Sequence, residues 1–347
     1  MPDVDTDGLV SQTDVAPGRA RWKGFATLLS VAISAILLVA VYRSVRIGLV
    51  VDALLEADKT WLVISVGMIL PITVLRAVRF YWVAPAGSLL GVGEALRLTL
   101  VASALNVFLP AKTGDLVKSY FVATRGSTPA GVALAIVVYE RLCDLFGLIA
   151  WCVVGWFVGR PQIDGLPTAF WWLLGGVGVV CAVLISSERA AWLVQAIVGR
   201  VAPHGRLPAL HRVAGGWSGL LTLLRGRRRW VVLYSMMLWL THLFQLWLFT
   251  VALSLGIPFT VSASLSAVAL MAGQLPFTFA GLGARDMALV VLLAGYTTPE
   301  HAAAVGVLIS TRGLLPPLIG LPIIRPYLSL AVEDARAWRR KAASAPG

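Results

Sequence analysis

Charged side chains recur at short, fixed spacings inside long apolar stretches of this sequence. Arg76 and Arg79 are three positions apart in one stretch, and Glu140, Arg141 and Asp144 lie together in another. Residues three or four apart share a helical face, so Glu140 and Asp144 face one way and Arg141 projects about 100° away. A charge at the centre of a bilayer costs roughly 2.5–3.5 kcal/mol, so each of these residues is expected to have a partner.

Two further segments place proline, glycine and charge in the middle of apolar sequence. Residues 109–115 read Leu-Pro-Ala-Lys-Thr-Gly-Asp, and residues 275–286 read Leu-Pro-Phe-Thr-Phe-Ala-Gly-Leu-Gly-Ala-Arg-Asp. Such breakers end helices, and the backbone N–H groups freed at helix ends favour an anion. Glycine lets a ligand approach the backbone closely.

Anion binding is the chemistry that these residues favour. Arginine binds phosphate and carboxylate groups through two parallel hydrogen bonds, so a water-accessible cavity lined by arginines would hold an anionic head group. The structural alternative pairs Arg76 or Arg79 with Glu140 or Asp144, and pairs Asp115 or Asp286 with Arg141 or Arg312. The candidate substrate-binding residues are Arg76, Arg79, Asn106, Pro110, Gly114, Asp115, Lys118, Glu140, Arg141, Asp144, Gly281, Gly283, Arg285, Asp286 and Arg312.

The composition requires that a membrane surrounds these residues. Of 347 residues, 58% are hydrophobic and 13% are charged, and the mean hydropathy is +0.83. The apolar stretches reach the ~20 residues that cross ~30 Å of hydrocarbon, where only helices satisfy the backbone of such segments. The sequence therefore predicts an all-α polytopic membrane protein, with about six full spans at 25–42, 61–83, 130–158, 170–186, 231–253 and 302–324.

Basic residues between the spans predict the topology. The linker 188–230 contains eight arginines against one acid, and basic residues also stand before the first span and after the last. By the positive-inside rule all three regions are cytoplasmic. Two spans precede the segment 95–123 and two follow it before the linker, so this segment must leave on the side where it entered. The same count makes 262–295 a re-entrant hairpin from the opposite side.

Matching spacings support an inverted repeat of this arrangement. Arg76 and Arg79 lie 34 and 31 positions before Pro110, and His242 and Gln245 lie 34 and 31 positions before Pro276. Asp115 lies 26 positions before Arg141, as Asp286 does before Arg312. Opposed repeats with broken helices are typical of transporters. We therefore expect repeat one at about 61–158 and repeat two at about 231–324.

The remaining parts of the chain are expected to be peripheral. Residues 1–18 lack periodicity and are expected to be disordered. Residues 19–325 form a single transmembrane domain, in which 191–201 is an amphipathic helix on the inner leaflet, and 326–347 form a basic cytoplasmic tail. The first apolar run lacks a cleavage site and should remain a span. We expect a multi-pass protein of the cell (cytoplasmic) membrane with both termini cytoplasmic.

Several other chemistries find no support in the sequence. The three cysteines and four histidines show no metal-ligand spacing, so no metal and no cofactor are expected. The formal charge of +12 is explained by the positive-inside bias rather than by nucleic acid. No nucleotide motif or nucleophile elbow is present, which disfavours an enzyme.

Taken together, these motifs resemble a known family. The motifs Arg76-x-x-Arg79, Asn106 followed by Leu-Pro and Gly114-Asp115, Glu140-Arg141-x-x-Asp144, and Leu-Pro followed by Gly281-x-Gly283-x-Arg285-Asp286 resemble the transmembrane region of lysylphosphatidylglycerol synthases. The likeness covers about 25–325, and it implies a domain that moves a modified lipid across the cytoplasmic membrane. The chain departs from the pattern at Asp286, where the family usually has glutamate. It also ends at Gly347 without room for a soluble aminoacyl-transfer domain, so we do not expect this chain alone to synthesise lysylphosphatidylglycerol.

We therefore predict a flippase or translocator of an anionic, aminoacylated or polyprenyl/hopanoid-type lipid. The expected partners are that lipid, the bilayer and a lipid-biosynthesis enzyme. Two alternatives remain open at this point. The first is a secondary transporter of a small ion or solute, which an inverted repeat also permits. The second is a membrane-embedded lipid-modifying transferase with Asp115 or Glu140 as general base.

Overall fold

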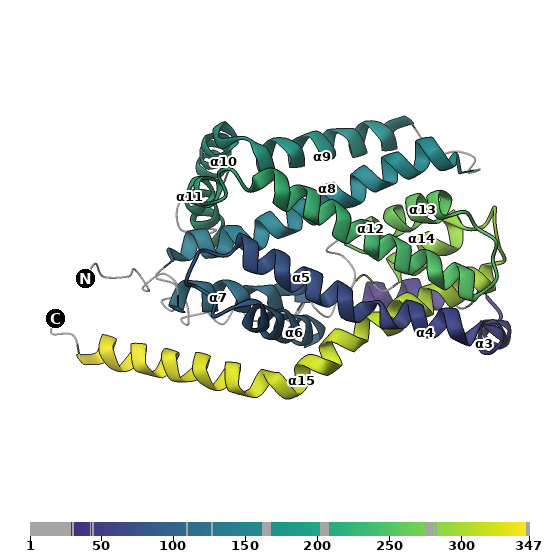
Figure 1. The fold of residues 1–347 in the computed structure, drawn as a ribbon, viewed down its shortest axis with the longest axis horizontal. Coiled ribbons are helices and arrows are strands. Elements are labelled where there is room, and N and C mark those ends of the chain that lie inside the picture. Colours follow the sequence, from purple (N-terminus) through teal and green to yellow (C-terminus); the bar gives the residue numbers. More distant parts are fainter. Residues whose placement is uncertain are drawn as a thin grey trace.

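The computed structural model describes residues 29, 31–41, 43, 45–108, 110–125, 128–161, 168–201, 208–274, 281 and 283–344. The expected disordered arm 1–18 and most of the second breaker segment, 275–280 and 282, lie outside this set. The described chain is helical and contains no strand (Figure 1). After a helical segment Val31–Val41, the elements are α3 (Ile47–Glu56), α4 (Lys59–Gly67), α5 (Ile69–Val83), α6 (Val92–Phe108), the 3₁₀ helix η1 (Pro110–Asp115), α7 (Leu116–Arg125), α8 (Ala130–Gly159), α9 (Thr168–Ser186), α10 (Glu188–Val201), α11 (Pro208–Leu223), α12 (Arg228–Ala252), α13 (Phe259–Ala272), α14 (Ala284–Leu292) and α15 (Pro299–Ser344).

Five long apolar helices match five of the six predicted spans. They cover Lys59–Val83, Ala130–Gly159, Thr168–Ser186, Arg228–Ala252 and Pro299–Leu330. The sixth predicted span, 25–42, is described only in part, as the shorter apolar helix Val31–Val41. The chain is therefore an integral membrane protein with several transmembrane helices.

Lipid-facing surfaces explain the large apolar side chains left exposed on these spans. Val63, Phe157 and Trp172 are each more than two-thirds exposed, which a protein surface in water would not carry as a continuous pattern. The buried apolar side chains form two clusters. One joins α12 and α13 to α8, and the other joins α5, α6 and α11 to α8.

Local sequence explains where several helices begin and bend. Asp58 caps the first long span, because its carboxylate accepts from the backbone N–H groups of Thr60 at 2.8 Å and Trp61 at 3.2 Å. Four prolines, at 316, 317, 322 and 326, lie inside α15. Proline removes a helical hydrogen bond and kinks the helix, and Figure 1 shows α15 bent along its length.

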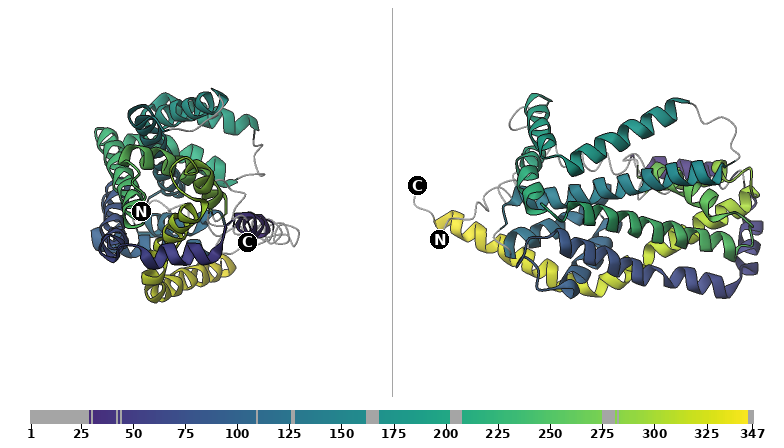
Figure 2. Two further views of the ribbon diagram at one scale, coloured as in Figure 1. Left: turned by 90° about the vertical axis from the view of Figure 1, so that its right-hand side faces the viewer. Right: turned by 45° about the horizontal axis from the view of Figure 1, so that its top comes forward.

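Both linkers contain more helix than the sequence predicted. The short linker after the first span forms α3, which is joined to the start of α15 by an ion pair of 3.6 Å between Arg46 and Glu300. The basic linker 188–230 forms α10, which includes the predicted 191–201, and also α11, which was not predicted. The backbone of α11 packs directly on α8, where a Cβ atom on Gly131 would lie 2.5 Å from the Arg212 carbonyl oxygen. Figure 2 shows α10 and α11 at one end of the molecule, running across the direction of the spans.

Each breaker segment joins two helices that pack on each other. The pairs are α6 with α7, through η1, and α13 with α14. Figure 1 shows α6 and α7 toward the end that carries α10 and α11, whereas α13 and α14 lie toward the end that carries α3. The packing is reciprocal, because α6 packs against α15 and α13 packs against α8.

Candidate functional site

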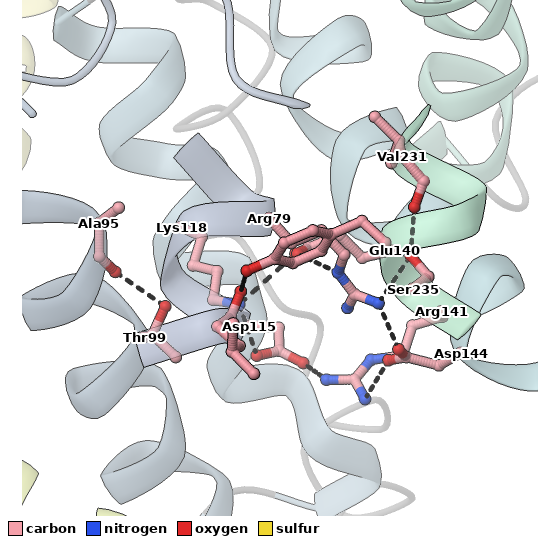
Figure 3. Close-up of polar contacts among 12 residues, drawn as sticks. Arg79, Ala95, Thr99, Asp115, Lys118, Glu140, Arg141, Asp144, Val231 and Ser235 are labelled. Carbon is pink, nitrogen blue, oxygen red and sulfur yellow. Dashed lines mark hydrogen bonds and ion pairs between the residues drawn. The ribbon is translucent and has the colours of Figure 1, made fainter. Parts of the chain in front are cut away.

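A cluster of six charged side chains lies between α5, η1, α7 and α8. Arg79 on α5 is at its centre (Figure 3). Its Nη1 donates to Asp144 Oδ1 at 2.6 Å and to Ser235 Oγ at 3.2 Å. Its Nε lies 3.4 Å from Glu140 Oε1. One arginine therefore joins two acids on successive turns of α8 to α12.

The breaker segment supplies the other half of this cluster. Arg141 donates to Asp115 at the end of η1, and its Nη1 lies 3.8 Å from Asp144 Oδ2. The Lys118 ammonium lies 3.5 Å from Glu140 and 3.8 Å from Asp115. We call Arg79, Asp115, Lys118, Glu140, Arg141 and Asp144 the first charge cluster. Its three cations and three carboxylates balance.

Burial distinguishes Arg141 from its neighbours. The side chains of the other five members are between 3% and 7% exposed, whereas that of Arg141 is 34% exposed. Arg141 lies about 16 Å from the start of α8, at 1.5 Å per residue, and is the twelfth of the 30 residues of this helix, so it is near the middle of the span. The cluster therefore presents one cation to its surroundings at mid-span.

Uncharged groups add further hydrogen bonds to this cluster. The Trp239 indole N–H donates to Asp144 Oδ1 at 3.0 Å. Ser235 accepts from Arg79 and donates to the Val231 carbonyl at 2.8 Å. A carboxylate buried among such donors stays ionised at a lower cost than an isolated one. The sequence interpretation missed both partners, because serine and tryptophan are common in apolar helices and carry no signal of their own.

A second group of polar side chains lies between α12, α14 and α15. Arg312 on α15 donates through Nη1 to Gln245 Oε1, and the same nitrogen lies 3.3 Å from His242 Nδ1. The Gln245 amide in turn donates to the Ser65 carbonyl at 2.6 Å. Arg312 lies about 20 Å along α15 from Pro299, so it too is at mid-span.

The described part of the second breaker segment brings Arg285 and Asp286 to α15. Arg285 Nη2 donates to Ser310 Oγ at 2.6 Å and to Asp286 Oδ1 at 3.1 Å. Asp286 Oδ2 accepts from the Gly283 N–H at 3.0 Å and so caps α14. We call His242, Gln245, Arg285, Asp286, Ser310 and Arg312 the second polar cluster.

Arg76 is on α5, three residues before Arg79. It is half-buried, and its charge acts on Lys118, Arg141 and Arg312. Among the residues that the structure describes, no carboxylate is within ion-pairing distance of Arg76. The rings of Trp239 and His242 stack at 5.0 Å, so the polar side chains form a continuous path from Asp144 to Arg312.

Close backbone contacts explain the glycines of the breaker segments. A Cβ atom on Gly114 would lie 2.6 Å from the Ala102 carbonyl oxygen and 2.8 Å from Asn106 Oδ1. Gly281 has φ +79° and packs on Gly273 in the same way. In both cases the contacted residue, Asn106 or Gly273, lies eight positions before the glycine. Pro110 begins η1, at the end of α6.

The sequence interpretation thus selected residues that the structure brings together in two groups. Arg79 forms ion pairs with both of its candidate partners, Glu140 and Asp144. Asp115 forms an ion pair with Arg141. Asp286 pairs with its neighbour Arg285 rather than with Arg312. His242 and Gln245 were absent from the candidate set, although their spacing to Pro276 had marked them as counterparts of Arg76 and Arg79.

Comparisons with known proteins show the family of this chain. The family model described as lysylphosphatidylglycerol synthase TM region matches residues 27–320. A UPF0104 membrane protein of Methanocaldococcus jannaschii is 19% identical over 310 residues, which cover 83% of this chain and 91% of that protein. No solved structure gives a significant match. Since the family model spans most of the chain and the resemblance read from the motifs is the same, the chain belongs to the lysylphosphatidylglycerol synthase transmembrane-region family.

Proposed function

We propose that this protein translocates a lipid with an anionic head group across the cytoplasmic membrane. The observation that carries the proposal is the position of the first charge cluster. It lies at mid-span, and the Arg141 side chain is 34% exposed beside five buried charged partners. A purely structural ion network would shield all its charges from hydrocarbon. An accessible Arg141 guanidinium at mid-span could instead bind the anionic head group of a lipid while it crosses from one leaflet to the other.

We further propose that the segments α6–η1–α7 and α13–α14 are re-entrant hairpins. At 1.5 Å per residue, α7 is about 15 Å long and α14 about 14 Å, too short to cross ~30 Å of hydrocarbon. Glu94, in the first turn of α6, pairs with Arg125, the last residue of α7. The two ends of this segment therefore lie side by side. The hairpins belong to inverted repeats at about 61–158 and 231–324, and the reciprocal packing of α6 on α15 and α13 on α8 supports that symmetry.

Orientation follows from the basic helices. The end of the molecule that carries α10 and α11 bears Arg189, Arg200, Arg212 and the run 227–229, so we place it in the cytoplasm. The hairpin α6–η1–α7 then opens from the inner leaflet and α13–α14 opens from the outer leaflet. Such an arrangement gives a head group an approach from each side to charges at mid-span.

Reconstituted liposomes test the proposal. Purified protein is inserted into vesicles that contain a fluorescent anionic phospholipid, and the loss of leaflet asymmetry is followed by dithionite quenching. Wild type should speed translocation, and Arg141→Ala should slow it at least tenfold. Arg46→Ala is the matched control, because the Arg46 side chain is 81% exposed and lies at the end of the bundle. Equal rates for wild type, Arg141→Ala and protein-free vesicles across candidate lipids would reject the proposal.

A further inference from the structure

The second polar cluster contains more positive than negative charge. Arg285 and Arg312 face the single carboxylate of Asp286, whereas the first charge cluster has three cations and three acids. Arg76 adds another cation, which is half-buried on α5. A guanidinium in the membrane interior without a counter-charge is costly, and the usual solution is a bound anion or a paired acid.

Asp286 does not neutralise Arg312. One of its carboxylate oxygens accepts from the Gly283 N–H at 3.0 Å, and the other accepts from Arg285 at 3.1 Å. The carboxylate also lies close to α15, where a Cβ atom on Gly306 would be 2.7 Å from Oδ1. Asp286 therefore serves as the cap of α14 and as the partner of Arg285.

Arg312 is held by neutral groups at one edge only. Nη1 makes both contacts, to Gln245 Oε1 and to His242 Nδ1. The bond from Gln245 to the Ser65 carbonyl fixes the amide so that its oxygen faces Arg312. Since an arginine can only donate, His242 Nδ1 must accept, and the imidazole is neutral with its proton on Nε2. Nε and Nη2 of Arg312 have no partner among the described residues, although the residue is only 8% exposed.

Arg76 lies beside the buried face of α5. The buried face of α5 contains Ile72, Thr73, Arg79 and Phe80, and Arg76 follows Ile72 and Thr73 at helical spacings of four and three. It nevertheless remains half-buried rather than buried. An inward-facing arginine that is partly exposed and has no acid within reach among the described residues has its donors available for a ligand.

We propose that Arg312 and Arg76 together bind one phosphate group, and that the second polar cluster is the seat of this anion. The free Nε–Nη2 edge of Arg312 matches two oxygens of a tetrahedral oxyanion, and Arg76 supplies the second positive charge. This inference rests on the proposed function only in taking the phosphate to be that of a lipid head group. Free inorganic phosphate has the same chemistry. The first charge cluster, by contrast, has three cations and three carboxylates, so it needs no bound anion to balance its charge.

Equilibrium binding tests this assignment without any translocation step. The full chain is purified in a non-ionic detergent and titrated with short-chain phosphatidylglycerol, and the bound lipid is counted by native mass spectrometry. Diacylglycerol with the same chains is the phosphate-free control, and inorganic phosphate at ~10 mM is the competitor. Arg312→Gln and Arg76→Gln should each raise the Kd for phosphatidylglycerol about tenfold or more, the loss expected for one charge-assisted hydrogen bond. Arg312→Lys should lie between, and Arg46→Gln should bind as wild type does.

The outcomes separate the possibilities. Wild-type affinity in both Arg312→Gln and Arg76→Gln, or equal binding of diacylglycerol, overturns the assignment. If Arg312→Gln fails to fold, the Kd of Arg76→Gln tests the assignment. This variant is expected to fold, because Arg76 forms no ion pair with any described acid that its removal would leave unpaired. Competition by inorganic phosphate shows that the phosphate group suffices, whereas variant-sensitive lipid binding without competition assigns the site to lipid-borne phosphate. Variant-sensitive binding by a wild type that fails to translocate lipid would reject the proposed function and leave the anion site standing.

Discussion

Arg79 on α5 donates to Asp144 on α8 across 2.6 Å, and both side chains are almost completely buried. The same arginine lies 3.4 Å from Glu140, and the same aspartate accepts from Trp239. Arg79 thus has a second acid beside it, and Asp144 has a second hydrogen-bond donor, so the surroundings of each residue stabilise its charge. Removing either one takes the nearest counter-charge from the other in a region of low dielectric constant.

We expect Arg79→Gln and Asp144→Asn each to destabilise the protein by about 3–5 kcal/mol. The double variant should lose less than the sum of the two, because it strands no charge of this pair. Thermal unfolding in detergent measures all three proteins. Arg46→Gln, at an exposed pair, should change stability by about 0–1 kcal/mol. Additive losses in the double variant would show that the two residues are not coupled.

The close contact at Gly114 gives a second prediction. A methyl group there would press on the Ala102 carbonyl and on Asn106, so Gly114→Ala should cost about 1–3 kcal/mol through overpacking. Gly175→Ala is the matched control, because nothing lies within 4 Å of a Cβ atom at that position. It should be neutral or slightly stabilising, since alanine favours a helix. A Gly114→Ala protein as stable as wild type would contradict the packing of η1 on α6.

The spans and many of the charged contacts were predictable because their causes are local. Hydrophobic length fixes a span, and the cost of buried charge requires partners for Arg79 and Asp115. The partners found in the structure, Glu140 and Asp144 for Arg79 and Arg141 for Asp115, are all on α8 and were all among the predicted ones. The register between the halves likewise pointed to His242 and Gln245, which contact Arg312 in the structure.

Other contacts depend on tertiary packing and left no local pattern. The helix α11 is moderately apolar, and its place against α8 depends on Gly216 meeting Gly131, residues 85 positions apart in the chain. The pairing of Asp286 with Arg285 rather than Arg312 depends on how α14 is capped. Ser235 and Trp239 were missed because only the position of α12 beside Arg79 and Asp144 gives them polar partners.

Glu188 gives a prediction on pH. It lies at the start of α10, outside the spans, and hydrogen bonds from Arg225, with help from Arg228, hold the pKa of its carboxyl below the ordinary value of 4.5. A carboxyl with a lowered pKa stabilises the fold above its ordinary pKa, and this contribution is lost as the pH falls through the lowered value. Hydrogen exchange in α10, corrected for intrinsic rates, should therefore be unchanged from pH 7 to about 5 and should quicken below about pH 4.5.

The matched variant for this effect is Glu188→Gln, which has no charge to lose. Its α10 should exchange slightly faster than wild type at pH 7 and should show no further loss at low pH. The change will be small, because the pair is exposed and screened by water. The same acid-induced loss of protection in Glu188→Gln would assign the effect to another group.

The ion pair between Glu94 and Arg125 leads to the last prediction, which concerns the course of the chain through the membrane. It joins the start of α6 to the end of α7, so the residues just outside these helices should face the same compartment. Cysteines introduced at Leu90, which precedes α6 and is 94% exposed, and at Thr124, an exposed residue in the last turn of α7, should both react with an impermeant maleimide from the side of α10. Cysteines at Ser254 and Gly295, which flank α13 and α14, should both react from the other side.

The native thiols do not obscure this measurement, because Cys143, Cys152 and Cys181 are buried. A cysteine at Arg189 on α10, labelled only after the cytoplasmic face is made accessible, sets the reference for the inner side. Reaction of Leu90→Cys and Thr124→Cys from opposite sides would mean that 92–125 crosses the bilayer completely. In that case the two halves could not be inverted repeats. The head group would also no longer be able to reach the charges at mid-span from both leaflets.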